Sequence, residues 1–202
     1  MGNININGGK ISIYSNDDGI HADGVLTISD GIIDITKSYE GLEGLQVIIN
    51  NGDISIVSSD DGINSTATSG QGIVIDGGNL YILAGGDGLD SNSRTAYSGI
   101  VFKGGKTVVI STSGGNSAID TEAGYTYTSG SVLAILPNGG MTSEATHCSN
   151  FSSVAKKISM SLSSGKTLTV SVSNSAILSV KIPCNLSAIV IYLLSLIHIW
   201  RC

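Results

Sequence analysis

Acidic residues gather in short glycine-containing stretches that recur along this chain. The first, "SNDDGIHADG" (residues 15–24), holds three carboxylates and a histidine, and "KSYEGLEG" (37–44), "SSDDGINS" (58–65) and "GGDGLDS" (85–91) repeat it in part. Carboxylate and amide oxygens in flexible loops are the ligands of calcium, which takes about six to eight oxygens. The recurrence predicts stacked calcium-binding turns, so the elements that position them must be inferred next.

Glycine turns divide the chain into units whose anchor glycines are 22, 21, 26, 27 and 25 residues apart. The anchors are Gly9, Gly31, Gly52, Gly78, Gly105 and Gly130. A short alternating run of aliphatic residues lies on each side of every turn, and such self-similarity is typical of a solenoid whose coils bury one continuous aliphatic ladder. We therefore predict an all-β fold with a right-handed parallel β-helix over residues 1–137. A β-sandwich of short strands would explain the alternation equally well, but not the same turn chemistry recurring in register.

The pattern changes after Pro137. Residues 138–153 are small and polar and predict a linker, and residues 154–192 predict an antiparallel β element, a truncated cap over the open end of the solenoid. Residues 193–202, "LLSLIHIWRC", break every preference seen upstream and resemble a translated sequencing adapter, so we expect a non-native tail. The apolar stretch before the C-terminus is shorter than the roughly 20 residues of a spanning helix, so we expect no membrane span.

Charge is unevenly distributed in this chain of 202 residues. All 16 acidic residues and 5 of the 10 basic ones lie at or before Glu144, which gives that part a net charge of −11. An acidic body argues against nucleic acid as a partner and in favour of cations. The opening "MGNININGGK" already alternates like a strand and has no signal-peptide pattern.

In register, the acidic turns form two columns of side chains. The first holds Asp18, Glu40, Asp61, Asp87 and Ser117, and the second, three residues on, holds His21, Glu43, Asn64, Asp90 and Asp120. Neighbouring coils lie about 4.8 Å apart, where unit charges repel by about 1 kcal/mol in water and ~3 to 4 kcal/mol at an effective dielectric near 20. Only one lysine, Lys37, lies close to these turns. Raised pKa values could relieve the repulsion, but a bound calcium ion is the more economical answer.

The alternative is that Asp, Asn and Gly are simply turn formers. We expect that plain role for Asp30, Asp34, Asp53 and Asp76. His21 has no cysteine or second histidine near it, so a turn-facing polar residue is favoured over a zinc ligand. The three cysteines, Cys148, Cys184 and Cys202, have no metal-ligand spacing.

The stretch from Ser15 to Asn64 resembles the bacterial carbohydrate-binding β-helix family typified by cellulose- and acidic-sugar-binding surface proteins. The likeness continues to about Tyr192. It implies a parallel β-helix like that of polysaccharide lyases, bound Ca²⁺, sugar binding without a need for catalysis, and an extracellular or cell-surface location with an export signal upstream. The residues that match the acidic turns of that family are Asp17, Asp18, Asp23, Glu40, Glu43, Asp60, Asp61 and Asn64. With Asp87, Asp90 and Asp120 from the columns, they form the expected calcium-ligand set.

Three functions compete at this point. The first is a calcium-stabilised, non-catalytic module that binds polysaccharide, either cellulose or a polymer containing uronic acid. The second is a calcium-dependent, pectate-type lyase, whose base would be Lys37 or Arg94. The third is a structural surface stalk or adhesin. Sugar stacking would fall to Tyr14, Tyr39, Tyr81 or Tyr97, and we expect carbohydrate contacts from Tyr14, Tyr39, Lys37 and Arg94.

Overall fold

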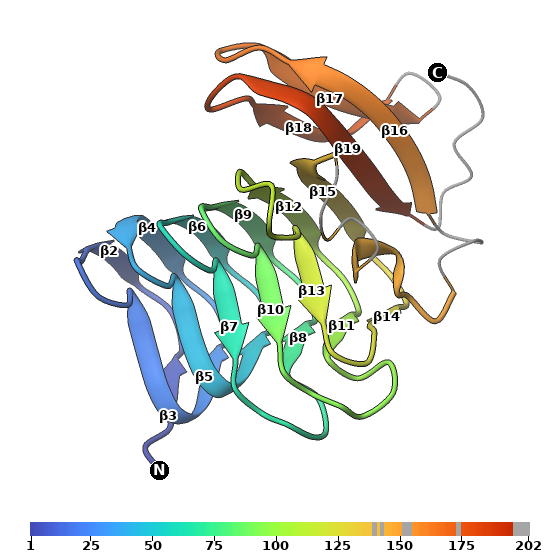
Figure 1. Ribbon diagram of the computed structural model, residues 1–202. Coiled ribbons are helices and arrows are strands. Elements are labelled where there is room, and N and C mark those ends of the chain that lie inside the picture. The colour runs from blue at the N-terminus through green and yellow to red at the C-terminus, as the bar shows by residue number, and fades with distance from the viewer. Residues whose placement is uncertain (139–140, 142–143, 151–154, 173–174, 196–202) are drawn as a thin grey trace.

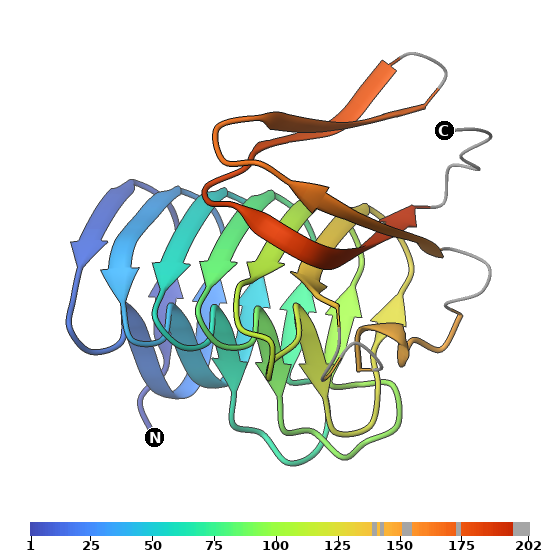
Figure 2. The ribbon, with the colours of Figure 1, turned by 45° about the horizontal axis from the view of Figure 1, so that its top comes forward.

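The computed structural model of the chain describes residues 1–138, 141, 144–150, 155–172 and 175–195. These residues form an all-β solenoid of about five turns, followed by an antiparallel sheet, as the sequence predicts. Figure 1 shows the coils stacked side by side from β2 to β15, and Figure 2 shows the same stack turned toward the viewer. Within the described residues no helix is long and apolar enough to cross a membrane.

Parallel strands form two long faces of the solenoid. The nine-stranded sheet consists of β1 (Ile4–Ile6), β3 (Ile20–Ile28), β5 (Leu42–Ile49), β7 (Ile63–Ser65), β8 (Ile73–Ile75), β10 (Leu89–Ser91), β11 (Ile100–Phe102), β13 (Ile119–Thr121) and β14 (Thr126–Tyr127). The eight-stranded sheet consists of β2 (Lys10–Tyr14), β4 (Ile32–Ser38), β6 (Asp53–Ser58), β9 (Asn79–Ala84), β12 (Lys106–Ser111), β15 (Ser131–Pro137), β19 (Leu186–Ser195) and β16 (Ala155–Leu162). The strands β3 and β5 each run through a bend, and later coils divide the same path into two short strands, such as β7 and β8.

Aliphatic side chains at equivalent positions stack into the core. In the eight-stranded sheet, Ile35 pairs with Ile56 and Ile56 with Ile82, and all three are fully buried. This ladder arises because strand residues alternate between the two faces, so one face of every coil turns inward. Burying one such side chain contributes about 1.5–3 kcal/mol.

The last coil is closed by aromatic residues and by the segment after Pro137. Tyr125 is fully buried and donates its hydroxyl to the carbonyl of Ala145, at 2.8 Å, in the short 3₁₀ helix η1 (Glu144–Thr146). Cys148 is buried in the same cluster, and its backbone forms an isolated parallel β-bridge with that of Tyr125. The described part of residues 138–153, which we expected to be a linker, therefore packs into the core and covers the end of the solenoid.

Two of the C-terminal strands, β16 and β19, continue the eight-stranded sheet. Strand β19 pairs antiparallel with both β15 and β16. The hairpin of β17 (Thr167–Val172) and β18 (Ser175–Lys181) packs on the outer face of that sheet, where Leu178 and Val180 contact a second cluster with Val108 and Leu133. Strand β19 also extends to Ser195, three residues into the expected tail (193–202), and the rest of that tail lies outside the described residues.

Candidate metal centre in the acidic columns

Backbone pairing confirms the register of both acidic columns. In the second column the pairs are His21 with Glu43, Glu43 with Asn64, Asn64 with Asp90, and Asp90 with Asp120. In the first column, a backbone amide in each coil donates to the carbonyl of the next column residue, from Gly19 to Glu40, Gly41 to Asp61, Gly62 to Asp87 and Gly88 to Ser117. Ten positions predicted from glycine spacing thus stack along one edge of the solenoid.

The first column carries a second set of contacts that tie neighbouring coils together. Asp18 Oδ1 accepts the backbone amide of Glu40 at 3.3 Å, and Asp61 Oδ1 accepts that of Asp87 at 2.8 Å. Asp87 Oδ1 accepts the amide of Ser117 in the same way. Each of these carboxylates therefore organises the turn of the following coil, which is the turn-forming role that the sequence left open.

At the N-terminal end, an imidazole lies between two carboxylates. His21 Nδ1 is 3.0 Å from Asp18 Oδ2 and 2.6 Å from Glu43 Oε2. Burial alone would raise the pKa of Asp18, but hydrogen bonds from His21 and from the Glu40 amide outweigh it and lower that pKa. The Asp18 contact raises the pKa of His21. His21 is therefore more than a turn-facing polar residue, because its ring, when protonated, neutralises part of the acidic charge of the first two coils.

The middle of the columns lacks such a cation among the described side chains. Burial, with repulsion from neighbouring carboxylates, raises the pKa of Glu40, Asp87 and Asp90 to about 7 each. Burial likewise raises the pKa of Asp61 and of Asp120. Carboxyl groups with pKa values this high are partly protonated near neutral pH, and a bound cation would favour their ionised form.

Two observations test whether a metal ion fits these residues. Asn64 Oδ1 is buried and, among the described residues, accepts no hydrogen bond, although it lies between Glu43 and Asp90 in the second column. Among the described residues, the cluster of ligand atoms that lie within 4.8 Å of one another is at the other end, at Asp18, His21 and Glu43, where a protonated imidazole would take the place of a cation. An unsatisfied amide oxygen among carboxylates is a donor set suited to calcium, which binds both groups. The residues fit the ion, and when bound it would supply positive charge to the ionised column.

The remaining expected ligands lie beside the columns. Asp17, Tyr39 and Asp60 form a neighbouring row, because the amide of Tyr39 donates to the carbonyl of Asp17 and the amide of Asp60 to that of Tyr39. The Asp60 carboxylate accepts a hydrogen bond from the Tyr39 hydroxyl, which raises the pKa of that tyrosine. Asp23 is exposed on β3, two residues beyond the second column.

A protein-family model described as "Carbohydrate-binding domain-containing protein" matches residues 1–70 and residues 46–182 of this chain. The chain belongs to this family. Its two overlapping matches reflect the repeat, since one coil can align with several positions of a model built from similar coils. No curated protein matches the chain, and no solved structure matches it either. Family membership suggests a carbohydrate-binding role, and the finer likeness to polysaccharide-lyase-type β-helices stays a prediction.

In this carbohydrate-binding domain, three of the four expected sugar contacts lie near the acidic turns. Tyr14 is 74% exposed, and Lys37 Nζ lies 5.1 Å from the centre of its ring and 2.6 Å from Asn16 Oδ1. Tyr39 is 50% exposed. Arg94 is also exposed, but it lies in the loop between β10 and β11, where its amide donates to Thr68.

Two aspartates that we expected to be turn formers lie in strands. Asp34 lies within β4, and Asp53 begins β6. Both side chains line a groove on the outer face of the eight-stranded sheet, beside Asn79 and Tyr81. The alternation of Ile33 and Ile35 around Asp34 could have placed that aspartate on an outward face, but alternation does not indicate which outward face lines a groove.

Proposed function

We propose that this domain is a non-catalytic module that binds polysaccharide at the cell surface, and that calcium holds its acidic turns. The match of the carbohydrate-binding family to residues 1–70 and 46–182 carries the binding part of this proposal. A solenoid supports it as well, because stacked coils offer a long, regular surface to an extended polymer.

The geometry of the columns supports calcium. Glu40, Asp87 and Asp90 are half-buried carboxyl groups with pKa values raised to about 7, and Asn64 Oδ1 in the same columns is buried without a hydrogen bond from the described residues. A hard cation between neighbouring coils would accept electron pairs from carboxylate and amide oxygens of this kind. The ion would hold the columns ionised and could also bridge to a carboxylate of an acidic sugar.

The positions of the basic residues support binding rather than catalysis. A lyase needs a base beside the metal to remove a proton next to the sugar carboxylate. Lys37 Nζ is held by Asn16 Oδ1 and the Tyr14 ring, and Arg94 lies on a different loop.

The proposal is tested by co-sedimentation of the purified protein with insoluble cellulose and with calcium-crosslinked polygalacturonate gel. The protein should sediment with at least one of them, and a matched β-solenoid without acidic columns serves as the control. Ultraviolet absorbance of the supernatant should show no unsaturated product. Failure to bind either polymer would refute the binding role, and turnover that is lost in Lys37→Ala would establish the lyase in its place.

A further inference from the structure

The outer face of the eight-stranded sheet changes character from coil to coil. One outward row runs Lys10, Ile32, Asp53, Asn79 and Lys106, as the strand pairing shows. The next outward row runs Asp34, Ser55, Tyr81, Val108 and Leu133. The second row is therefore polar or aromatic in the early coils and apolar in the last two.

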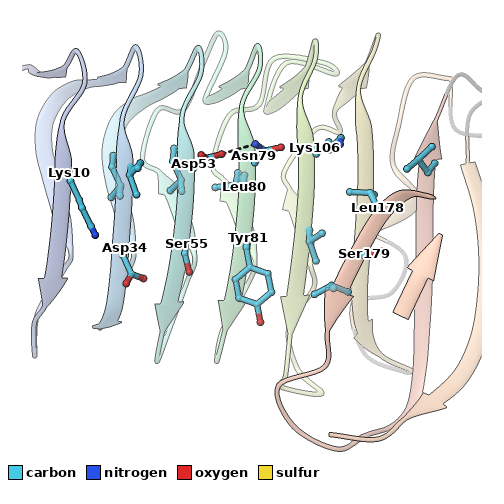
Figure 3. A pocket seen from close by; sticks show the side chains of 16 residues that line it. Lys10, Asp34, Asp53, Ser55, Asn79, Leu80, Tyr81, Lys106, Leu178 and Ser179 are labelled. Carbon is cyan, nitrogen blue, oxygen red and sulfur yellow. Dashed lines mark hydrogen bonds between the residues drawn. The ribbon is translucent and has the colours of Figure 1, made fainter. Parts of the chain in front are cut away.

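The C-terminal hairpin covers only the apolar end. Leu178 and Val180 of β18 pack against the cluster that contains Val108 and Leu133. The same strand forms one wall of a groove of about 560 Å³, whose floor is the outer face of β4, β6 and β9. Figure 3 shows Leu178 and Ser179 on this wall, opposite Tyr81. An open groove thus remains where the polar coils meet the edge of the hairpin.

The side chains of the groove suit a ligand rich in hydroxyl groups. Asp34 and Asp53 are acceptors, Lys10 and Lys106 are donors, and Asn79 provides both. Asn79 Nδ2 already donates to Asp53 Oδ1 at 2.6 Å, which fixes the orientation of both groups (Figure 3). The half-buried Tyr81 adds a ring with an apolar face and a polar hydroxyl. Sugars present this combination, since their hydroxyls both donate and accept and their C–H faces pack on aromatic rings.

Charge and length narrow the ligand further. Two lysines and two aspartates line the groove, so these groups leave it without net charge. The two aspartates would repel a uronate polymer and offset its attraction to the two lysines, whereas a neutral sugar can form hydrogen bonds with every one of these groups. The row from Lys10 to Lys106 crosses four steps between strands, which is about 19 Å at the ordinary strand spacing. That length accommodates several sugar rings in a row.

We infer that this groove, lined by Asp34, Asp53, Asn79 and Tyr81 and walled by β18, is the site that holds a strand of neutral polysaccharide. The inference rests on the proposed carbohydrate-binding function and locates it away from the acidic columns. Tyr81 packs under a sugar ring, and the Asp53–Asn79 pair binds hydroxyl groups of that ring or its neighbour. Calcium bound in the columns would then stabilise the fold without contacting this ligand.

The test is isothermal titration of the full chain with cellohexaose, a neutral β-linked hexamer, and with hexagalacturonate as the acidic comparison. Ser55→Trp fills the groove from the middle of its floor without touching the core, and Tyr81→Ala removes the ring. Each should weaken cellohexaose binding at least tenfold. Leu45→Ala is the control, because Leu45 is an exposed apolar residue on β5 of the nine-stranded sheet and lies outside the groove. Circular dichroism melts verify that each variant is folded.

The outcomes separate the site from the function. If Ser55→Trp binds cellohexaose with normal affinity, the groove is not the binding site, although the domain still binds carbohydrate. If the wild-type protein binds hexagalacturonate but not cellohexaose, the inference that the ligand is neutral is wrong. Absence of binding to both hexamers and to their parent polymers would refute the proposed function, and this inference with it.

Discussion

Asn64 donates its side-chain amide to both carboxylate oxygens of Glu40, at 3.1 and 3.2 Å, from the following coil of the solenoid. Burial still raises the pKa of Glu40 to about 7, with repulsion from Glu43 and Asp18 adding to the shift. The other end of the same amide, Oδ1, is buried without a partner among the described residues. The Asn64 side chain therefore stabilises the Glu40 carboxylate through its nitrogen and leaves its oxygen available to a cation.

Replacing Asn64 by aspartate should make folding more dependent on calcium. Asn64→Asp removes a donor to Glu40 and adds a buried carboxylate, which should lower the free energy of unfolding by about 1–3 kcal/mol in chelator. Calcium should restore more stability than it does in the wild type, because the site gains a charged ligand. Thermal melts with chelator and with calcium measure both effects. An equal loss under the two conditions would show that no cation reaches Asn64.

The metal-free protein should lose stability as the pH rises from about 4 to about 7. The pKa values of Glu40, Asp87 and Asp90 are raised to about 7 in the fold, so in this window the folded protein binds more protons than the unfolded chain, and its stability falls with increasing pH. The raised pKa of His21 acts in the same direction, but only near and above its ordinary pKa of 6.5, and the lowered pKa of Asp18 acts in the opposite direction, below its ordinary pKa of 3.8.

Urea melts in chelator at intervals across that pH range measure this slope. Asp90→Asn should flatten it, and Asp30→Asn, at an exposed turn outside the columns, should leave it unchanged. Calcium should also flatten the slope, because it favours the ionised carboxylates. A stability that rises with pH in chelator would contradict the assigned shifts.

Asp61→Asn should weaken the response to calcium more than Asp76→Asn does. Asp61 belongs to the first column, whereas Asp76 forms an exposed ion pair with Lys103 at 3.2 Å. Calcium at a hundredfold excess over its dissociation constant should stabilise the wild type by about 2.7 kcal/mol. Titration calorimetry and melting temperatures should both show the difference, and an identical response of the two variants would show that the column does not bind the ion.

Close stacking of the turns predicts a strict requirement for glycine at position 62. A Cβ atom there would lie 2.4 Å from the carbonyl oxygen of Gly88 and 2.2 Å from Ile82 Cγ2. Gly62→Ala should therefore destabilise the protein by about 1–3 kcal/mol, as overpacking does. Gly115→Ala is the control, because nothing lies within 4 Å of its added Cβ atom. Equal melting temperatures for the two variants would contradict the stacking.

The glycine periodicity was sufficient to predict the solenoid and the register of both columns. Each turn repeats the same residue types, and a one-residue slip would turn the buried isoleucines outward, so the pattern fixes which side chains stack. Asp90 and Asp120 could therefore be aligned with Asn64 from spacing alone, and the strands pair in that register.

Contacts between distant parts of the chain could not be predicted in this way. The place of His21 between Asp18 and Glu43 depends on side-chain rotamers, which spacing does not specify. The groove depends on how far the β17–β18 hairpin reaches over the sheet, and the repeat contains no information on that hairpin. For the same reason the segment around Ala145 and Cys148 was predicted as a linker, although its small polar composition conceals two buried residues.

Truncation at two points tests where the fold ends. Leu193 and Leu194 lie in β19 and are buried on opposite faces, Leu193 in the cluster beneath the hairpin and Leu194 in the main core. A chain that ends at Tyr192 loses both and should melt at a clearly lower temperature, since removing one buried leucine side chain costs about 2–5 kcal/mol. A chain that ends at Ser195 keeps the whole strand and should melt like the full chain, if residues 196–202 are foreign to the fold. Differential scanning calorimetry of the three proteins compares them directly. A loss on truncation at Ser195 as large as that at Tyr192 would show that the final seven residues contribute to stability, and it would refute their interpretation as a non-native tail.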